Sequence, residues 1–174
     1  MNGNLGVYFH IPFCRSKCAY CDFCSTSQWD DKLMDAYLEA LIRQLGDFFL
    51  PGGSYTVDTV YIGGGTPTSF SAEQLEAVMG AVQKNFDISK IREYTVEAGR
   101  ADSITREKLE VLKKHGVTRI SVNPQTMKEE TLKLIGRRHT VEQVKEAFAL
   151  AREIGFDNIN MDLILGLPNE TKED

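Results

Sequence analysis

The sequence has no cysteine outside one short segment, because all four of its cysteines lie between Cys14 and Cys24. A disulfide framework ties remote parts of a chain together, so a cluster of cysteines without distant partners argues against one. We expect a reducing compartment and a bound metal instead.

The sequence also lacks clusters of lysine and arginine and long apolar runs. Its formal net charge is -5, and binding to phosphates needs a concentrated basic surface, so we do not expect nucleic acid as a partner. No stretch approaches the roughly 20 apolar residues that cross a bilayer, and the N-terminus has neither the basic nor the long apolar region of a secretory signal. We therefore expect no transmembrane segment and a cytoplasmic location.

What the sequence does contain is an alternation of β-branched or aromatic runs with segments of helical period, which is typical of βαβ units. At 42% hydrophobic residues it can form one sizeable core, and no linker or repeat divides it, so we treat residues 1–174 as one domain. Strands are predicted over residues 6–11, 56–62, 93–97, 118–126 and 158–165. Helices are predicted over residues 32–49, from 71, over 105–115, over 128–135 and from 140.

Five strands are too few for a closed barrel, which usually takes about 250 residues. We therefore expect an α/β fold that forms a partial parallel barrel of about five βα units, truncated so that its last strand is an exposed edge. In such folds ligands bind at the carboxyl ends of the strands. The cysteines follow the first predicted strand, three glycines follow the second, Glu97 ends the third, Gln125 ends the fourth and Asp162 lies in the fifth.

The cysteines have a spacing that favours an iron–sulfur cluster. Cys14, Cys18 and Cys21 form a C-x3-C-x2-C pattern, and Cys24 follows at a further C-x2-C. Zinc sites usually join two separated pairs of ligands, and ferredoxin loops place a fourth cysteine at another offset. We interpret the pattern as three thiolates on a [4Fe-4S] cluster whose fourth iron is open to a ligand. A zinc site that uses all four cysteines, or a ferredoxin-like electron carrier, is the alternative, and Cys24 can also be a spare thiol or a small apolar side chain.

Two further groups of residues suggest a ligand near the cysteines. Gly63, Gly64 and Gly65 allow close approach of the backbone, and the turn lacks the lysine of a phosphate-binding loop, although a plain tight turn explains them equally well. Glu97 and Asp162 are carboxylates in apolar strands, where an unpaired charge costs several kcal/mol. Each carboxylate therefore binds either a ligand or a structural ion-pair partner.

The C-x3-C-x2-C pattern after a first strand, with Tyr20 before the last cysteine, resembles the radical S-adenosylmethionine (SAM) superfamily. The stretches "YFHIPFC", "GGGTPT", "GRRH" and "DLILGLP" are similar to the oxygen-independent coproporphyrinogen III oxidase-like proteins, which include related heme chaperones. The resemblance extends from about Tyr8 to Pro168 and implies the N-terminal part of a radical SAM barrel.

The resemblance also implies cofactors and roles for individual residues. Cys14, Cys18 and Cys21 would hold the [4Fe-4S] cluster. The residues that would contact SAM are Tyr8, Gly64, Gly65, Thr66, Glu97, Gln125, Arg137 and Asp162. A flavodoxin or ferredoxin-type protein would donate the electron, and His10 would lie beside the cluster unless it is an ordinary core histidine.

The implied activity is that of a radical SAM oxidoreductase of porphyrin or heme metabolism, which acts through a 5′-deoxyadenosyl radical on a porphyrinogen. A heme chaperone of the same family is the alternative. The stretches "EAGR" and "NPQT" depart from the usual family text and resemble a divergent branch, and Phe23 stands where the true oxidases have an additional cysteine. The resemblance thus leaves the substrate open.

Overall fold

The computed structural model describes residues 3–48 and 55–173. These residues form a five-stranded parallel sheet whose strands are ordered β1-β2-β3-β4-β5, as they are in the sequence. The strands are β1 (Gly3–Ile11), β2 (Tyr55–Gly64), β3 (Glu93–Glu97), β4 (Arg119–Ser121) and β5 (Asn158–Asn160). The predicted α/β fold with a partial parallel barrel is confirmed, and β1 and β5 are the two edges of the sheet.

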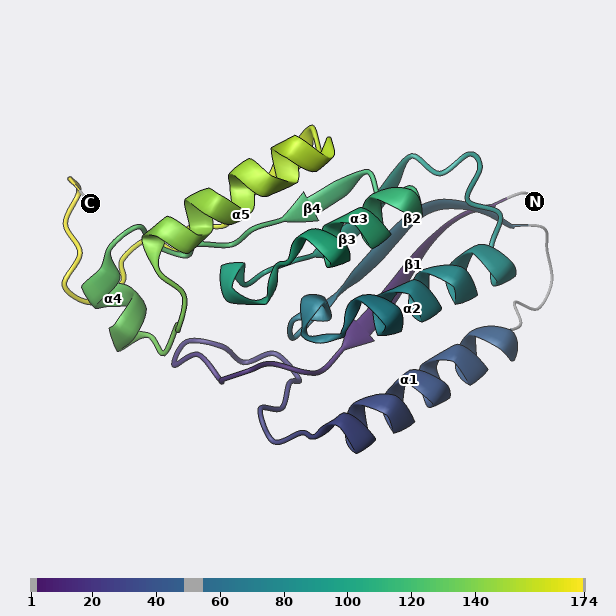
Figure 1. The fold of residues 1–174 in the computed structure, drawn as a ribbon, viewed down its shortest axis with the longest axis horizontal. Coiled ribbons are helices and arrows are strands. Elements are labelled where there is room, and N and C mark those ends of the chain that lie inside the picture. The colour runs from purple at the N-terminus through teal and green to yellow at the C-terminus, as the bar shows by residue number, and fades with distance from the viewer. Residues whose placement is uncertain (1–2, 49–54, 174) are drawn as a thin grey trace.

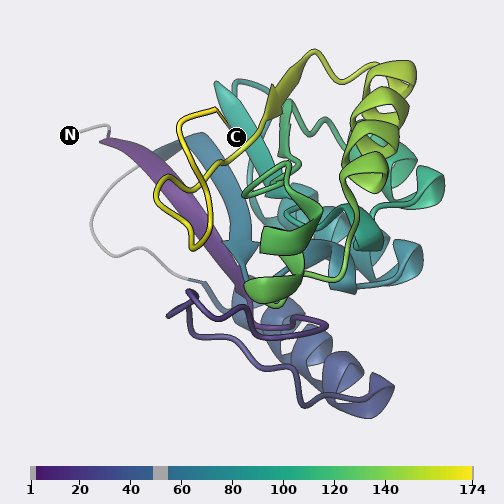
Figure 2. The same ribbon diagram turned by 90° about the vertical axis from the view of Figure 1, so that its left-hand side faces the viewer.

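Four helices cover one face of the sheet (Figures 1 and 2). They are α1 (Asp31–Gly46), α2 (Ala72–Asn85), α3 (Arg106–Lys114) and α5 (Val141–Ile154), and they contact one another in this order. The short helix α4 (Glu129–Leu134) lies beyond the carboxyl end of the strands, near the segment that contains the cysteines (Figure 1). Among the described residues, no helix has both the length and the apolar character needed to cross a membrane.

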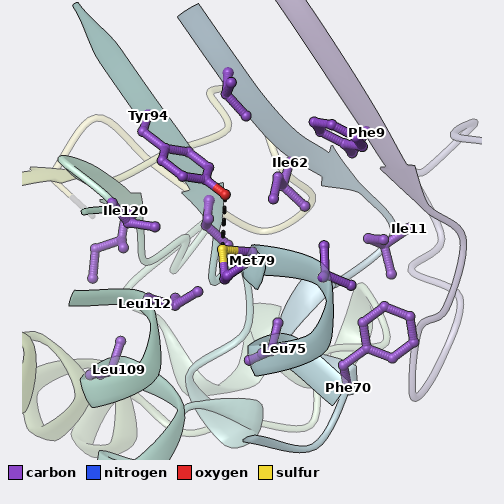
Figure 3. Packing of buried hydrophobic residues seen from close by; sticks show 14 of the residues in the cluster. Phe9, Ile11, Ile62, Phe70, Leu75, Met79, Tyr94, Leu109, Leu112 and Ile120 are labelled. Carbon is purple, nitrogen blue, oxygen red and sulfur yellow. Dashed lines mark hydrogen bonds between the residues drawn. The ribbon is translucent and has the colours of Figure 1, made fainter. Parts of the chain in front are cut away.

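The core fills the space between the sheet and these helices (Figure 3). Because successive side chains of a strand point to opposite faces, Phe9 and Ile11 of β1 are buried against the helices, whereas Tyr8 is 54% exposed. Tyr94 lies at the centre of the core, and its hydroxyl donates a hydrogen bond to Sδ of Met79, 3.0 Å away. The opposite face of the sheet carries Tyr8 and Tyr61, which are paired in register and are less buried than the residues of the core.

The predicted helix starts agree with the structure because polar residues cap them. Ser71 and Thr140 each accept a hydrogen bond from the backbone three residues later and form capping boxes with Gln74 and Gln143. The helix predicted over residues 32–49 is observed as α1, but α1 ends at Gly46, so the predicted end was too late; residue 49 lies outside the described residues.

The predictions for the fourth and fifth strands were too long. β4 ends at Ser121 rather than at residue 126, and β5 ends at Asn160 rather than at residue 165. Pro124 has no N–H to donate to a ladder, and Gln125 has a φ of 68°, which breaks the extended conformation. A single bridge between Gln125 and Leu163 keeps the two chain segments together beyond the strands.

The buried face of α3 gives a direct test of this packing. Leu109 is fully buried, so we expect Leu109→Ala to lower the free energy of unfolding by about 2–5 kcal/mol. Leu33 on α1 is 47% exposed and provides the matched control, because Leu33→Ala removes the same atoms from a half-exposed position. Urea unfolding followed by circular dichroism measures both changes, and equal losses in the two variants would contradict the described packing.

Candidate functional site

A pocket lies at the carboxyl ends of the strands, where the sequence places its polar residues. It is lined by the cysteine loop (residues 12–30), by the ends of β2 and β3, and by the segments that follow β4, α4 and β5. All predicted site residues except Tyr8 line this pocket: Cys14, Cys18, Cys21, Gly64, Gly65, Thr66, Glu97, Gln125, Arg137 and Asp162. Residues that are 148 positions apart in the sequence thus meet in one place.

The cysteine loop is held at several points along its length. The N–H of Cys14 donates to the carbonyl of Thr26, 2.9 Å away, and the N–H of Thr26 donates to Pro12, so the loop closes on itself. The N–H of Ala19 donates to the carbonyl of Ile135 at 3.0 Å, which fixes the far end of the loop beside α4. The loop therefore has a defined course over the pocket.

The four cysteines are free thiols and differ in their position. Cys14, Cys18 and Cys21 are half-buried and line the pocket, whereas Cys24 is exposed and is not among the lining residues. Among the described residues, no three His, Cys, Asp or Glu side chains lie close enough together to bind one metal ion. Three cysteines nevertheless line one pocket, and an iron–sulfur cluster is held by several cysteine thiolates at once.

The glycine turn after β2 packs against the beginning of the cysteine loop. The N–H of Gly65 donates to the carbonyl of Ile11 at 2.7 Å, and the N–H of Thr66 donates to the carbonyl of Phe13 at 2.8 Å. A Cβ atom on Gly65 would lie 2.7 Å from the Phe13 oxygen, and Gly64 has a φ of 108°. Only glycine fits at these two positions without displacing the backbone.

Glu97 lies at the end of β3 beside this turn. Its Oε1 accepts a hydrogen bond from the Tyr61 hydroxyl at 2.5 Å, and its Oε2 accepts one from the N–H of Gly64 at 3.2 Å. Burial raises the pKa of Glu97 above its ordinary value, although the bonds from Tyr61 and Gly64 act in the opposite direction and Asp162 raises the pKa further. The carboxylate is thus held in a partly desolvated position that favours a cationic ligand.

Asp162 does not lie in an apolar strand, as the sequence suggested, and that interpretation was wrong. It follows β5, its side chain is exposed, and its Oδ1 accepts a hydrogen bond from Asn160 at 2.7 Å. Its backbone carbonyl accepts from the N–H of Gln125 at 3.0 Å, because the irregular segments after β4 and β5 run side by side. Asp162 therefore reaches the pocket rim without the cost of burial.

Arg137 is buried and links the cysteine loop to the sheet. Its Nε and Nη2 donate to the Tyr20 hydroxyl at 3.2 and 2.9 Å, and its Nη1 donates to the carbonyl of Gly99 at 3.0 Å. Burial raises the pKa of Tyr20 to about 12, although Arg137 acts in the opposite direction. The phenol remains protonated at neutral pH.

Tyr8 lies apart from the pocket lining. Its hydroxyl is 2.9 Å from Nδ1 of His10, and Nε2 of His10 is 2.6 Å from the carbonyl oxygen of Cys24. His10 also lies against the glycine turn, since a Cβ atom on Gly64 would be 2.7 Å from its ring. The two side chains thus contact the end of the cysteine loop at Cys24, and a place of His10 beside a cluster stays a prediction.

The sequence did not indicate several other lining residues, which include Ser16, Asn123 and Arg100. Arg100 is 3% exposed although it lies in the loop between β3 and η2 (Ala101–Ser103), and its Nη2 is 3.0 Å from Sγ of Cys18. The only signal was its place directly after the predicted third strand, in the unusual "EAGR" stretch.

Comparison with known proteins agrees with this geometry. Residues 8–174 match the sequence profile of the radical SAM superfamily. The chain is 47% identical over 171 residues to the oxygen-independent coproporphyrinogen-III oxidase-like protein HemZ of Bacillus subtilis, covering 95% of this chain and 34% of HemZ. It is 42% identical over 166 residues to the heme chaperone HemW of Bacillus subtilis, covering 95% of this chain and 43% of HemW.

A solved structure shares the fold. The structure of coproporphyrinogen III oxidase (HemN) from Escherichia coli, described as a radical SAM enzyme, superposes with a TM-score of 0.89 at 31% identity. The match covers 99% of this chain and 39% of HemN, so the chain spans less than half the length of the relatives that it matches. On the extent of the profile match, the chain belongs to the radical SAM superfamily.

Proposed function

We propose that the chain is the N-terminal part of a radical SAM core that binds a [4Fe-4S] cluster through Cys14, Cys18 and Cys21 and binds SAM beside it. The observation that carries the proposal is that these three cysteines, the glycine turn and Glu97 line one pocket. The donor set fits the cluster, because three free thiols and no fourth cysteine face the pocket. A bound cluster would supply one electron to SAM, which on C–S cleavage gives methionine and a 5′-deoxyadenosyl radical.

The polar residues of the pocket complement the charges of SAM. Glu97 is the partly buried anion available to the ammonium or the ribose hydroxyls, and Asp162 adds a second carboxylate at the rim. The glycine turn lets backbone groups approach the ligand closely, since a side chain on Gly64 or Gly65 would collide with His10 or Phe13. The guanidinium of Arg137 could bind the carboxylate of SAM, and its Nη1 and Nη2 donate to Gly99 and Tyr20 in this structure.

The contribution of the protein is therefore to bind and orient SAM and to exclude water from the pocket. Tyr20 and Phe23 place aromatic rings from the cysteine loop in the pocket wall. The one-electron donor that we propose is a flavodoxin or ferredoxin-type protein. The four free thiols stay reduced in a reducing compartment, so the proposal places the chain in the cytoplasm.

At the level of substrate, we propose a role in porphyrin or heme metabolism, as a coproporphyrinogen dehydrogenase-like enzyme. The supporting observation is the similarity to proteins named as an oxidase-like protein and a coproporphyrinogen III oxidase. A heme chaperone is the second candidate, because relatives at 42% identity carry that name. The test uses a protein that contains this chain and has the full length of its relatives. Decarboxylation of coproporphyrinogen by that protein would favour the enzyme, and heme binding without turnover would favour the heme chaperone.

Anaerobic reconstitution followed by electron paramagnetic resonance tests the cofactor proposal. We expect the reduced chain to show a [4Fe-4S] signal that changes when SAM is added. A colourless chain that binds zinc with all four cysteines would contradict the proposal and favour a structural metal site. A cluster signal that SAM leaves unchanged would favour a ferredoxin-like carrier.

The cysteines should divide into three ligands and one that is not a ligand. We expect Cys14→Ser, Cys18→Ser and Cys21→Ser each to lose most of the bound iron and sulfide, because a hydroxyl is a poor substitute for a thiolate at iron. Cys24→Ser is the matched control and should retain both, since Cys24 lies outside the pocket lining. Iron and acid-labile sulfide per chain measure the result, and an equal loss in Cys24→Ser would overturn the assignment.

Glu97 should give SAM binding a dependence on pH. Because the pKa of Glu97 is raised, its carboxylate loses its charge at a higher pH than an ordinary glutamate as the solution is acidified. We expect the SAM affinity of the cluster-loaded chain to fall as pH decreases through this range, and Glu97→Gln to bind about 10-fold more weakly at neutral pH without this step.

Equilibrium dialysis with labelled SAM at several pH values makes the measurement. Glu110→Gln removes the same charge from an exposed position on α3 and is the control. Equal affinity and the same pH profile in Glu97→Gln and in the unmodified chain would exclude this role of Glu97.

A further inference from the structure

Arg100 is a buried cation that reaches from the sheet to the cysteine loop. It lies directly before the short turn η2 (Ala101–Ser103) that follows β3, and it is 3% exposed. Its Nη1 donates to Oγ of Ser16 at 2.9 Å, and its Nη2 is 3.2 Å from the carbonyl oxygen of Ser16 and 3.0 Å from Sγ of Cys18. One side chain thus contacts the loop at two positions, and one of them is a proposed ligand of iron.

The charge of Arg100 has no carboxylate partner among the described residues. The nearby Asp102 forms its ion pair with Arg15, with Nη1 and Oδ2 3.8 Å apart, and none of the ion pairs in the described part of the chain includes Arg100. Burying a charge without an opposite charge beside it costs several kcal/mol of folding free energy, so we expect a buried arginine to have a negatively charged partner. Among its hydrogen-bond partners, only the sulfur of Cys18 can carry a negative charge.

Resting on the proposed function, we propose that Arg100 is a positioning residue of the cluster site, which holds Cys18 in its ligating conformation and raises the reduction potential of the bound cluster. Hydrogen bonds to the sulfurs and nearby net charge are among the factors that set the potentials of iron–sulfur clusters. Addition of one electron makes the cluster and its thiolates more negative, and an adjacent guanidinium stabilises that added charge. Arg100 thereby favours the one-electron reduction that SAM cleavage requires.

The contacts with Ser16 and Cys18 depend on the planar, forked guanidinium group of an arginine. Two of its nitrogens bond to Ser16 and Cys18 at the same time, whereas a lysine ammonium is a point charge on a flexible stem. Ser16 also donates to the carbonyl of Gly136 at 3.2 Å, so the loop is held between the end of β3 and the segment after α4. These hydrogen bonds join protein atoms alone, so the proposal has a test that does not need the cluster.

The first measurement is hydrogen exchange in the metal-free chain. The N–H groups of Ala19 and Cys21 are hydrogen-bonded within this part of the structure, and we expect them to exchange about 10-fold faster in Arg100→Gln, as a loss of about 1.4 kcal/mol would give. Arg15→Gln is the matched control, because Arg15 is a half-exposed arginine of the same loop that contacts Asp102 and no cysteine. Unchanged exchange in Arg100→Gln, or equal acceleration in both variants, would overturn the positioning role.

The second measurement is a redox titration of the reconstituted chain followed by electron paramagnetic resonance. We expect a lower midpoint potential in Arg100→Gln than in the unmodified chain, and a potential close to the unmodified value in Arg15→Gln. A purely structural role would alter cluster content without shifting the potential of the clusters that remain. Equal potentials in the unmodified chain and in Arg100→Gln would therefore overturn the electrostatic role.

Arg100→Lys keeps the inference open to test if Arg100→Gln does not fold. It retains the charge but not the fork. We therefore expect Ala19 and Cys21 to exchange faster, and the midpoint potential to be lower, than in the unmodified chain and in Arg15→Gln. If Arg100→Lys leaves both values unchanged, the inference fails. Failure of the unmodified chain to take up a cluster would instead refute the proposed function, and the exchange experiment would still decide whether Arg100 holds the loop.

Discussion

The close contact between the glycine turn and the start of the cysteine loop positions the rest of the site. Parallel pairing of β1 and β2 brings the carboxyl ends of both strands together, so the segments that follow them must pass each other at short range. Gly65 allows this passage, because its N–H bonds to Ile11 and any Cβ atom would strike the Phe13 oxygen. The start of the cysteine loop, which includes Cys14, and the proposed SAM-binding backbone are therefore held together at one junction.

Charged side chains of both signs line the pocket. Arg100 and Arg137 are buried and bond to the cysteine loop, whereas Glu97 ends β3 and Asp162 follows β5. In the proposed function, the arginines suit a cluster whose thiolates are anionic, and the carboxylates suit the ammonium of SAM. Charges of both signs in one pocket would then give a bound SAM molecule a preferred orientation.

Much of this arrangement follows from local sequence patterns. The capping residues Ser71 and Thr140 mark the helix starts, and the positions of the cysteines, the glycines and Glu97 relative to the strands predict that they meet. The length of β5 could not be judged, because an apolar run continues past Asn160 while the chain leaves the regular ladder there, and β4 ends at Ser121, before Pro124 and the positive φ of Gln125. The exposure of Asp162 was missed for the same reason, and the contact of Arg100 with Cys18 depends on a loop that returns from 82 positions earlier in the chain.

A crystal structure of the anaerobically reconstituted chain with SAM, with anomalous diffraction recorded at the iron edge, tests the account most directly. The account predicts iron bound to the sulfurs of Cys14, Cys18 and Cys21, with SAM between that iron and the wall formed by Gly64, Gly65 and Glu97. A metal ion held by four cysteines including Cys24, or SAM bound outside this pocket, would contradict it.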